Sequence, residues 1–149
     1  FFTFTPCHPY QLIYERDRED LVFIDDYAHH PSELKVAIDA ARTLFPGRKL
    51  TGIFQPHLYS RTRDFVDGFA AELDKLDEII LMDIYPAREL PIEGVTSESI
   101  FNRMKNPNKK LVTKETLMDT LKAYNLEILM TLGAGDIDTF VPKIKELYK

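Results

Sequence analysis

Apolar and polar residues are distributed along this chain in two alternating patterns. Short apolar runs that are typical of buried strands occupy residues 50–54, 78–82 and 126–130, with a shorter run at 111–112. Between these runs, apolar residues recur at spacings of three and four, which is the period of one face of a helix. Strands that alternate with helices predict a mostly parallel sheet. We therefore expect an α/β, Rossmann-like fold with helices on both faces of the sheet.

The first two predicted strands depart from this alternation. The segments Tyr10–Glu15 and Leu21–Ile24 flank a turn of five charged residues at 16–20 and predict an N-terminal hairpin strand. Residues 10–149 are expected to form one domain, because a chain of 149 residues is long enough to bury one sizeable core. Residues 1–9 are expected to be a linker or a segment added to that domain.

Helices are expected at about residues 31–45, 60–76, 96–104, 115–124 and 138–147. Pro31 suits the first turn of the first helix, since proline has no N–H to leave unpaired there. Pro142 is tolerated only near a helix start, so the regular part of the last helix is predicted to begin near Asp138 or Thr139.

Composition and charge exclude several classes of protein. The net charge of -5 argues against a general nucleic-acid or membrane-surface binder, because such proteins usually present a basic face. The single cysteine, Cys7, cannot form an internal disulfide, which favours a reducing, cytoplasmic location. No apolar run approaches a membrane span, and no Cys/His spacing is typical of a zinc site. A first residue that is not Met suggests that the sequence was taken from a longer protein.

Polar segments follow four of the predicted strands, at the point where each strand ends. They are residues 25–31, 55–63, 83–86 and 133–136. In an open parallel sheet, ligands bind in the crevice outside the carboxyl ends of the strands. We therefore expect the four segments to build one shared site.

The first segment places two acids and two histidines at the mouth of this crevice. These residues also have an explanation without a binding site, in which Asp25 and Asp26 cap the turn and one histidine is merely exposed. Adjacent side chains of an extended segment point in opposite directions, so at most one of each pair is expected to face a given ligand. A metal site built from His29 and His30 together is therefore not expected.

The second segment carries an arginine near a predicted helix start. Arg61 lies between two hydroxyl residues and is typical of a carboxylate or phosphate grip, because a guanidinium offers a planar pair of donors. Arg63 is expected instead to be solvated and paired with Asp64 or Asp67.

The glycines of the fourth segment are weaker evidence for a nucleotide site. Gly133 and Gly135 permit close backbone approach, but a dinucleotide fingerprint would need a further glycine where Asp138 stands. A tight turn explains them equally well. No Walker-type phosphate loop occurs, since Ile53 and Phe54 occupy the positions of its Lys and Ser/Thr.

The motifs together resemble the C-terminal domain of the Mur ligases. The similarity rests on residues 25–33, 54–62, 83–92 and 133–136, and it extends over about residues 20–149. It implies part of a three-domain, ATP-dependent enzyme of peptidoglycan synthesis that joins L-alanine to UDP-N-acetylmuramate through an acyl phosphate. The phosphate-loop lysine and the Mg²⁺ ligands would belong to a central ATPase domain against which this domain packs. The fragment alone would be inactive and would hold no catalytic residue and no metal.

The resemblance also implies roles for individual residues. Asp26, with Tyr27 nearby, would bind the ATP ribose, whereas His29 and Arg61 would position the incoming alanine. The residues expected to line the same site are Asp25, His30, His57, Tyr59, Ser60, Asp83, Tyr85, Gly133 and Gly135. Leu58 departs from relatives that carry arginine at this position, which removes a second cationic contact.

Two alternatives remain open on the sequence. A recycling ligase that attaches a whole peptide to UDP-N-acetylmuramate shares the motif at 26–31, although residues 54–62 favour the alanine enzyme. A free-standing nucleotide-binding or regulatory module is the other alternative. Neither nucleic acid nor a membrane is an expected partner.

Overall fold

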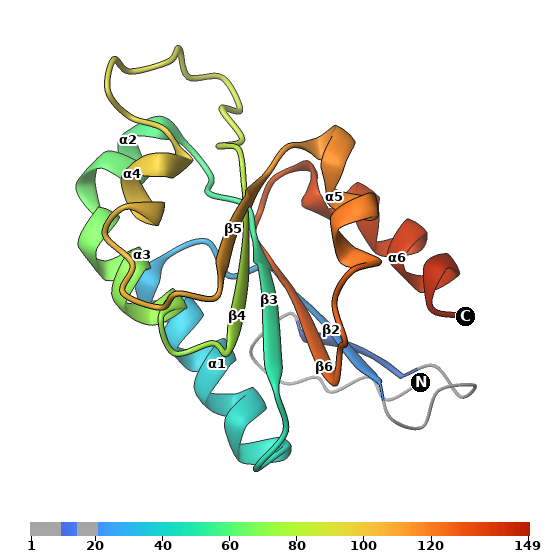
Figure 1. Cartoon of the computed structure of the whole chain (residues 1–149). Coiled ribbons are helices and arrows are strands. Elements are labelled where there is room, and N and C mark those ends of the chain that lie inside the picture. Colours follow the sequence, from blue (N-terminus) through green and yellow to red (C-terminus); the bar gives the residue numbers. More distant parts are fainter. Residues whose placement is uncertain (1–9, 15–20) are drawn as a thin grey trace.

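The computed structural model describes residues 10–14 and 21–149 and contains a six-stranded sheet. The strand order across the sheet is β1-β2-β6-β3-β4-β5 (Figure 1). All neighbouring strands pair in parallel except the first two. The predicted α/β class is confirmed. The strands are β1 (Tyr10–Tyr14), β2 (Val22–Asp26), β3 (Leu50–Phe54), β4 (Glu78–Met82), β5 (Lys109–Val112) and β6 (Ile128–Leu132).

The predicted hairpin strand is also confirmed. β1 pairs with β2 in antiparallel register, with Tyr10 opposite Asp26 and Tyr14 opposite Val22. The predicted turn at 16–20 and the predicted linker at 1–9 lie outside the described residues. β2 continues two residues beyond the predicted end at Ile24, so both aspartates belong to the strand.

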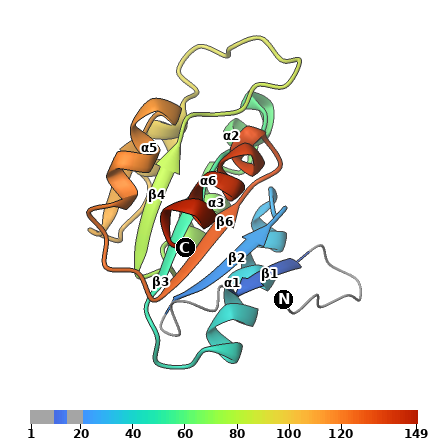
Figure 2. The same ribbon diagram turned by 90° about the vertical axis from the view of Figure 1, so that its right-hand side faces the viewer.

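Helices cover both faces of the sheet (Figures 1 and 2). One face carries α1, α3 and α4, whose buried side chains join a core cluster with residues of four strands, and the other carries α5 and α6. The helices are α1 (Pro31–Leu44), α2 (Tyr59–Asp64), α3 (Val66–Leu73), α4 (Ser97–Phe101), α5 (Lys114–Leu121), the 3₁₀ helix η1 (Asp136–Phe140) and α6 (Val141–Leu147).

The two core clusters explain why the central strands carry apolar residues on both faces. Along β4, Ile79 and Leu81 contribute to the cluster beneath α1 and α3, whereas Ile80 and Met82 contribute to the cluster beneath α5 and α6. All four side chains are fully buried. Successive side chains of a strand point to opposite faces, so a strand covered on both sides is mostly apolar along its length.

The helix predicted over residues 60–76 is wrong in its extent. The chain leaves helical geometry at Phe65, with φ -121° and ψ 22°, and this break separates α2 from α3. α3 ends at Leu73, and Leu76 is buried from the turn that follows, where its side chain packs against Gly52. Apolar spacing cannot detect such a break, because Phe65 keeps an apolar side chain at a helical position.

The C-terminal helix begins later than predicted. A 3₁₀ turn covers Asp136–Phe140, and the regular helix starts at Val141, not at Asp138 or Thr139. Pro142 therefore lies in the first turn, where its missing N–H has no intrahelical partner to lose. The last strand likewise ends at Leu132, two residues beyond the predicted end.

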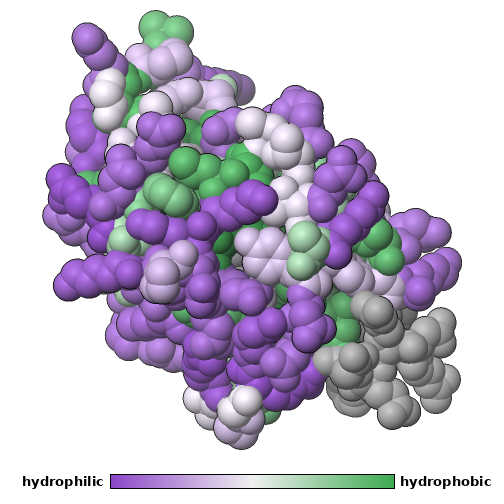
Figure 3. Space-filling model, in the orientation of Figure 1, coloured by the Kyte–Doolittle hydropathy of each residue, from purple (hydrophilic) through white to green (hydrophobic). Residues whose placement is uncertain are grey.

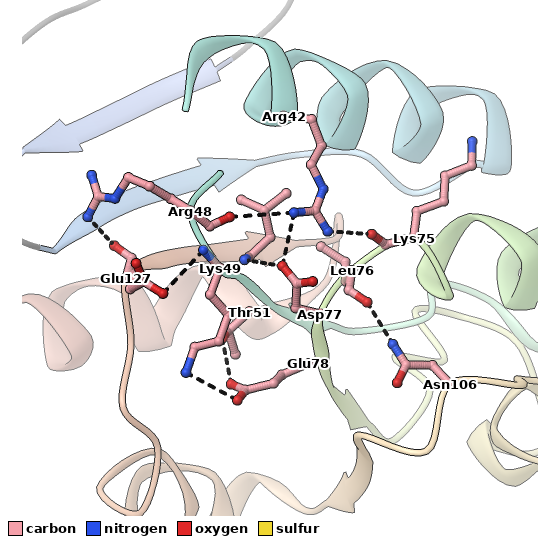
Figure 4. A network of polar contacts seen from close by, with 11 residues as sticks. Arg42, Arg48, Lys49, Thr51, Lys75, Leu76, Asp77, Glu78, Asn106 and Glu127 are labelled. Atoms are coloured by element: carbon pink, nitrogen blue, oxygen red, sulfur yellow. Dashed lines mark hydrogen bonds and ion pairs between the residues drawn. The ribbon is translucent and has the colours of Figure 1, made fainter. Parts of the chain in front are cut away.

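A network of polar contacts joins the amino ends of the central strands (Figure 4). Asp77 Oδ2 accepts hydrogen bonds from Arg42 Nη1 at 2.9 Å and from the Leu50 N–H at 2.8 Å. Thr51 Oγ1 donates to Glu78 Oε2 at 2.7 Å. These contacts stabilise the edge of the sheet opposite to the one where the polar segments emerge.

The surface of the domain is mainly hydrophilic on the face in Figure 3, with small apolar areas between charged side chains. Leu90 is the most exposed of the large apolar residues in the described part of the chain, at 84%. Within residues 10–14 and 21–149, no helix combines the length and the apolar character that a membrane crossing needs.

Candidate functional site

The position of β6 between β2 and β3 brings three of the polar segments together. Because β6 is the central strand of the three, the chain at its carboxyl end bonds to both neighbours. The Gly133 N–H donates to Asp26 O at 3.1 Å, and the Gln55 N–H donates to Leu132 O at 3.0 Å. The segments that follow β2, β3 and β6 therefore form one continuous edge.

The segment after β4 joins the same edge through a short parallel bridge. His57 and Tyr85 form an isolated bridge, in which the Tyr85 N–H donates to Pro56 O at 2.8 Å and the Leu58 N–H donates to Tyr85 O at 2.9 Å. The Tyr85 ring stacks on the His57 ring, with centroids 5.7 Å apart and planes 17° apart. All four predicted segments thus meet at the carboxyl ends of the strands.

A cluster of two imidazoles and one guanidinium lies on this edge. The His29 and His57 rings meet edge to face with centroids 5.8 Å apart, and Arg61 Nη1 is 3.1 Å from His57 Nδ1. A guanidinium can only donate, so His57 Nδ1 must accept and the neutral ring carries its proton on Nε2. Burial lowers the pKa of His57, and the nearby positive charge of Arg61 and the ring of His29 lower it further. These effects favour the neutral form of His57.

His29 is held in the opposite tautomer. Its Nδ1 lies 2.9 Å from Tyr27 O, and a carbonyl can only accept, so Nδ1 carries the proton. Glu33 Oε1 lies 3.5 Å from the same nitrogen. The neutral ring consequently keeps an acceptor lone pair on Nε2, and the His29 side chain is 25% exposed. His29 can accept a hydrogen bond, whereas Arg61 can donate several.

The two aspartates of β2 point to different faces, as the strand period predicts. Asp26 is buried, and its Oδ1 accepts a hydrogen bond from the Ala28 N–H at 2.8 Å. Asp25 Oδ1 instead accepts from Thr131 Oγ1 at 2.7 Å. Burial raises the pKa of Asp25, and Asp138 adds to this rise. Asp26 thus fixes the turn that leads to His29, and the two acids do not form a joint site.

Both glycines after β6 are required by close packing. A Cβ on Gly135 would lie 2.4 Å from Gln55 Oε1 and 2.6 Å from Tyr85 Cβ. Gly133 has a φ of +144°, and a Cβ there would lie 2.8 Å from Gln55 O. The tight-turn explanation of these glycines therefore has a physical basis, because each lets the chain pass against a neighbouring segment.

Some predicted residues lie apart from the cluster of His29, His57 and Arg61. His30 caps α1, with its Nδ1 3.2 Å from the Ser32 N–H, and its ring packs against Phe65. Asp83 is exposed and lines a separate depression at the starts of α4 and α5, together with Thr96 and Thr113. Arg63 pairs with Asp64 at 2.8 Å, which confirms its predicted surface pairing.

Comparison with known proteins identifies the family. The family model described as "Mur ligase, glutamate ligase domain" matches residues 10–143. The chain belongs to the Mur ligase family. The UDP-N-acetylmuramate–L-alanine ligases of Flavobacterium johnsoniae and Parabacteroides distasonis are 55% and 54% identical to it, over 90% and 87% of the chain. This Mur ligase domain spans 30% and 28% of their lengths.

Solved structures show the same fold. The UDP-N-acetylmuramate-alanine ligase of Thermotoga maritima superposes with a TM-score of 0.72 at 24% identity, over 92% of this chain and 29% of that one. A folylpolyglutamate synthase of the same organism gives a TM-score of 0.63 at 11% identity, over 93% and 31% of the two chains. At these identities the likeness concerns the fold alone.

Two polar residues of the Mur ligase domain lie in predicted segments but were not named as site residues. Gln55 is buried, with its Nε2 donating to Asp136 Oδ1 at 2.6 Å and its Oε1 accepting from the Ile137 N–H at 2.8 Å. Glu89 accepts hydrogen bonds from the backbone N–H and the hydroxyl of Ser60. The polar side chain directly after the apolar run 50–54 is a signal for Gln55, but nothing local marks Glu89.

Metal ligands are not assembled in the described part of this Mur ligase domain. Residues 10–14 and 21–149 contain no group of three or more His, Cys, Asp or Glu side chains that could hold a metal ion. Tyr59 and Ser60 open α2 beside the cluster, so the edge offers hydroxyl, imidazole and guanidinium groups. Such groups suit an organic ligand that carries a carboxylate and an amine.

Proposed function

We propose that this domain is the C-terminal part of an ATP-dependent ligase that joins L-alanine to UDP-N-acetylmuramate in peptidoglycan synthesis. The observation that carries the proposal is the contact of His29, His57 and Arg61 at the edge where four segments meet. Relatives with 46–55% identity, which are named UDP-N-acetylmuramate–L-alanine ligases, support the choice of substrates.

The cluster suits the two charged ends of alanine. Arg61 donates one N–H to His57. A guanidinium has five N–H groups, so the others can bind a carboxylate in a planar pair of hydrogen bonds. The His29 Nε2 lone pair can accept a hydrogen bond from the amino group of the same molecule. In the proposed reaction this amino group attacks the acyl carbon of the UDP-N-acetylmuramyl phosphate, the amide bond forms and inorganic phosphate leaves. Orienting the amino group is the task of this domain.

ATP would be bound at the same edge. Asp26 ends β2 with its carboxylate oriented by the Ala28 N–H, and carboxylate oxygens are acceptors for ribose hydroxyls. Tyr27 is 55% exposed beside it. We assign the phosphate loop and the Mg²⁺ ligands to a central domain that packs against this one, because the described residues do not provide them. We place the reaction in the cytoplasm, where ATP is available.

Substitution of Arg61 tests this assignment. In the full-length ligase, Arg61→Ala should raise the KM for alanine by about 10- to 100-fold, because a hydrogen bond to a charged group contributes about 1.5–3 kcal/mol. The KM for ATP should change by less than about threefold, since the adenosine contacts are made elsewhere. Arg63→Ala is the matched control, because Arg63 pairs with its neighbour Asp64 at the surface. Equal increases in both KM values would contradict the assigned role.

The recycling ligase is the second candidate. The murein peptide ligase of Psychrobacter arcticus has a TM-score of 0.70 at 18% identity, which shows a common fold and no more. The recycling ligase attaches a whole peptide in place of alanine, so a competition assay between alanine and a tripeptide in the full-length protein separates the two activities. The isolated chain should not turn over ATP with alanine and UDP-N-acetylmuramate, and turnover would contradict the need for a central domain. A free-standing module is tested by sequencing the gene upstream of the codon for Phe1, where the ligase assignment requires a Gly-rich loop that ends in Lys-Thr or Lys-Ser.

A further inference from the structure

Two strained backbone positions lie at the junction of the second and third polar segments. Leu58 and Ala87 have φ values of 71° and 53°, and within the described part of the chain no other residue besides glycine has a positive φ. Such conformations cost free energy for residues with a Cβ and persist only where neighbouring contacts hold them. Leu58 precedes α2, and Ala87 lies in the connection between β4 and α4.

The connection between β4 and α4, residues 83–96, leaves the carboxyl end of the sheet and rises beside α2 (Figure 1). This connection makes one contact with the segment before α2 and one with α2 itself. The first contact is the bridge between Tyr85 and His57. The second is made by Glu89, four residues further along, whose own N–H closes a turn onto Pro86 O at 2.9 Å.

Glu89 supplies the cap that α2 lacks. Leu58 stands at the N-cap position and offers no side-chain hydrogen bond. Glu89 Oε1 accepts from the Ser60 N–H at 3.0 Å, and Oε2 accepts from the Ser60 hydroxyl. These hydrogen bonds lower the pKa of Glu89, and the charge of Arg63 lowers it further. The carboxylate is therefore ionised where the amide groups of the first helical turn are positive.

We propose that Glu89 is a positioning residue for the amino-acid substrate. It holds the start of α2 in place and thereby fixes the position of Arg61, which binds the substrate carboxylate. Arg61 directly follows Ser60, so movement at the start of α2 moves the guanidinium. The same connection stacks Tyr85 on His57, which accepts the hydrogen bond from Arg61. Residues 83–96 thus hold both the start of α2, through Glu89, and His57, through Tyr85, and both determine where Arg61 lies. This inference rests on the proposed function.

Kinetics of the full-length ligase test the proposal. Glu89→Ala should raise the KM for alanine about tenfold, the effect of losing about 1.4 kcal/mol, with the KM for ATP within about twofold of the wild type. Glu89→Gln keeps an oxygen that can accept from the Ser60 N–H and should restore part of the alanine affinity. Glu93→Ala, an exposed acid of the same connection, should leave both KM values unchanged. An unchanged alanine KM in Glu89→Ala, or equal changes in both KM values, would overturn the proposal.

Hydrogen exchange in the 149-residue chain tests the contact without any reaction. Glu89→Ala should speed exchange of the Ser60 amide at least about tenfold, while amides of the central strand β6 exchange as in the wild type. Unchanged exchange of the Ser60 amide would overturn the claim that Glu89 holds the start of α2. If the full-length wild type does not ligate alanine while exchange responds as expected, the proposed function fails and the contact stands.

Discussion

Gly135 offers a sharp test of how the four segments are packed. Replacing it with alanine adds one methyl group that would lie 2.4 Å from Gln55 Oε1 and 2.6 Å from Tyr85 Cβ. Its φ of -92° is open to any residue, so the substitution causes no backbone strain of its own. Both neighbours are also held in place, since Gln55 is buried with two hydrogen bonds and Tyr85 is bridged to His57.

The cost of this substitution follows from those contacts. Overpacking of a filled interior costs about 1–3 kcal/mol. Displacing Gln55 would also weaken a buried hydrogen bond, which costs about 1–3 kcal/mol when a partner is left unpaired. We therefore expect Gly135→Ala to lower the free energy of unfolding by about 3 kcal/mol, which corresponds to a fall in Tm of about 6–12 °C for a domain of this size.

Urea unfolding of the isolated chain measures this loss. Gly47→Ala is the control, because Gly47 has a φ of +76° and open space around its Cα. It should cost only about 1 kcal/mol, from backbone strain alone. A Gly135→Ala variant that is no less stable than Gly47→Ala would refute the packing explanation.

Two further predictions concern titrating groups. Because burial, Arg61 and His29 lower the pKa of His57, the stability that this residue contributes is present above its ordinary value of 6.5 and is lost as the pH falls below it. Arg61→Ala should raise the pKa of His57 in an NMR titration, and an unmoved pKa would argue against their contact. For Asp77, burial raises the pKa, but the hydrogen bonds from Arg42 and the Leu50 N–H outweigh this and lower it overall. The stabilisation by Asp77 should be lost as the pH falls below 3.8. Asp77→Asn should therefore cost about 1 kcal/mol of unfolding free energy at pH 7. At pH 2–3, the variant and the wild type should unfold at the same urea concentration. A cost that persists at that pH would refute the ionic origin.

Sequence reasoning located the elements of this fold better than their ends. Every strand expected from an apolar run is present, because a strand buried on both faces is mostly apolar along its length. The helix break at Phe65 and the late start of α6 were not foreseen. Both depend on how a segment packs against other elements, and the local spacing of apolar residues does not record this.

The candidate site was predictable as far as its segments, and less so in its contacts. His29, His57 and Arg61 were named from motifs and do meet. Asp83 shares the edge but lines another depression. Glu89 lies in a segment on which the resemblance rests, but its contact was not predicted, because its partner Ser60 lies 29 residues away and no local pattern links the two.

The sequence by itself determined which residues form strands and helices, and that polar segments follow the strands. These properties depend on the alternation of side chains over a few residues, which a single segment carries in full. Only the tertiary structure decided that β6 lies between β2 and β3, and that Tyr85 and Glu89 reach across to the residues around Arg61. Strand order and contacts between distant segments come from packing the whole chain around one sheet, so no segment contains them alone.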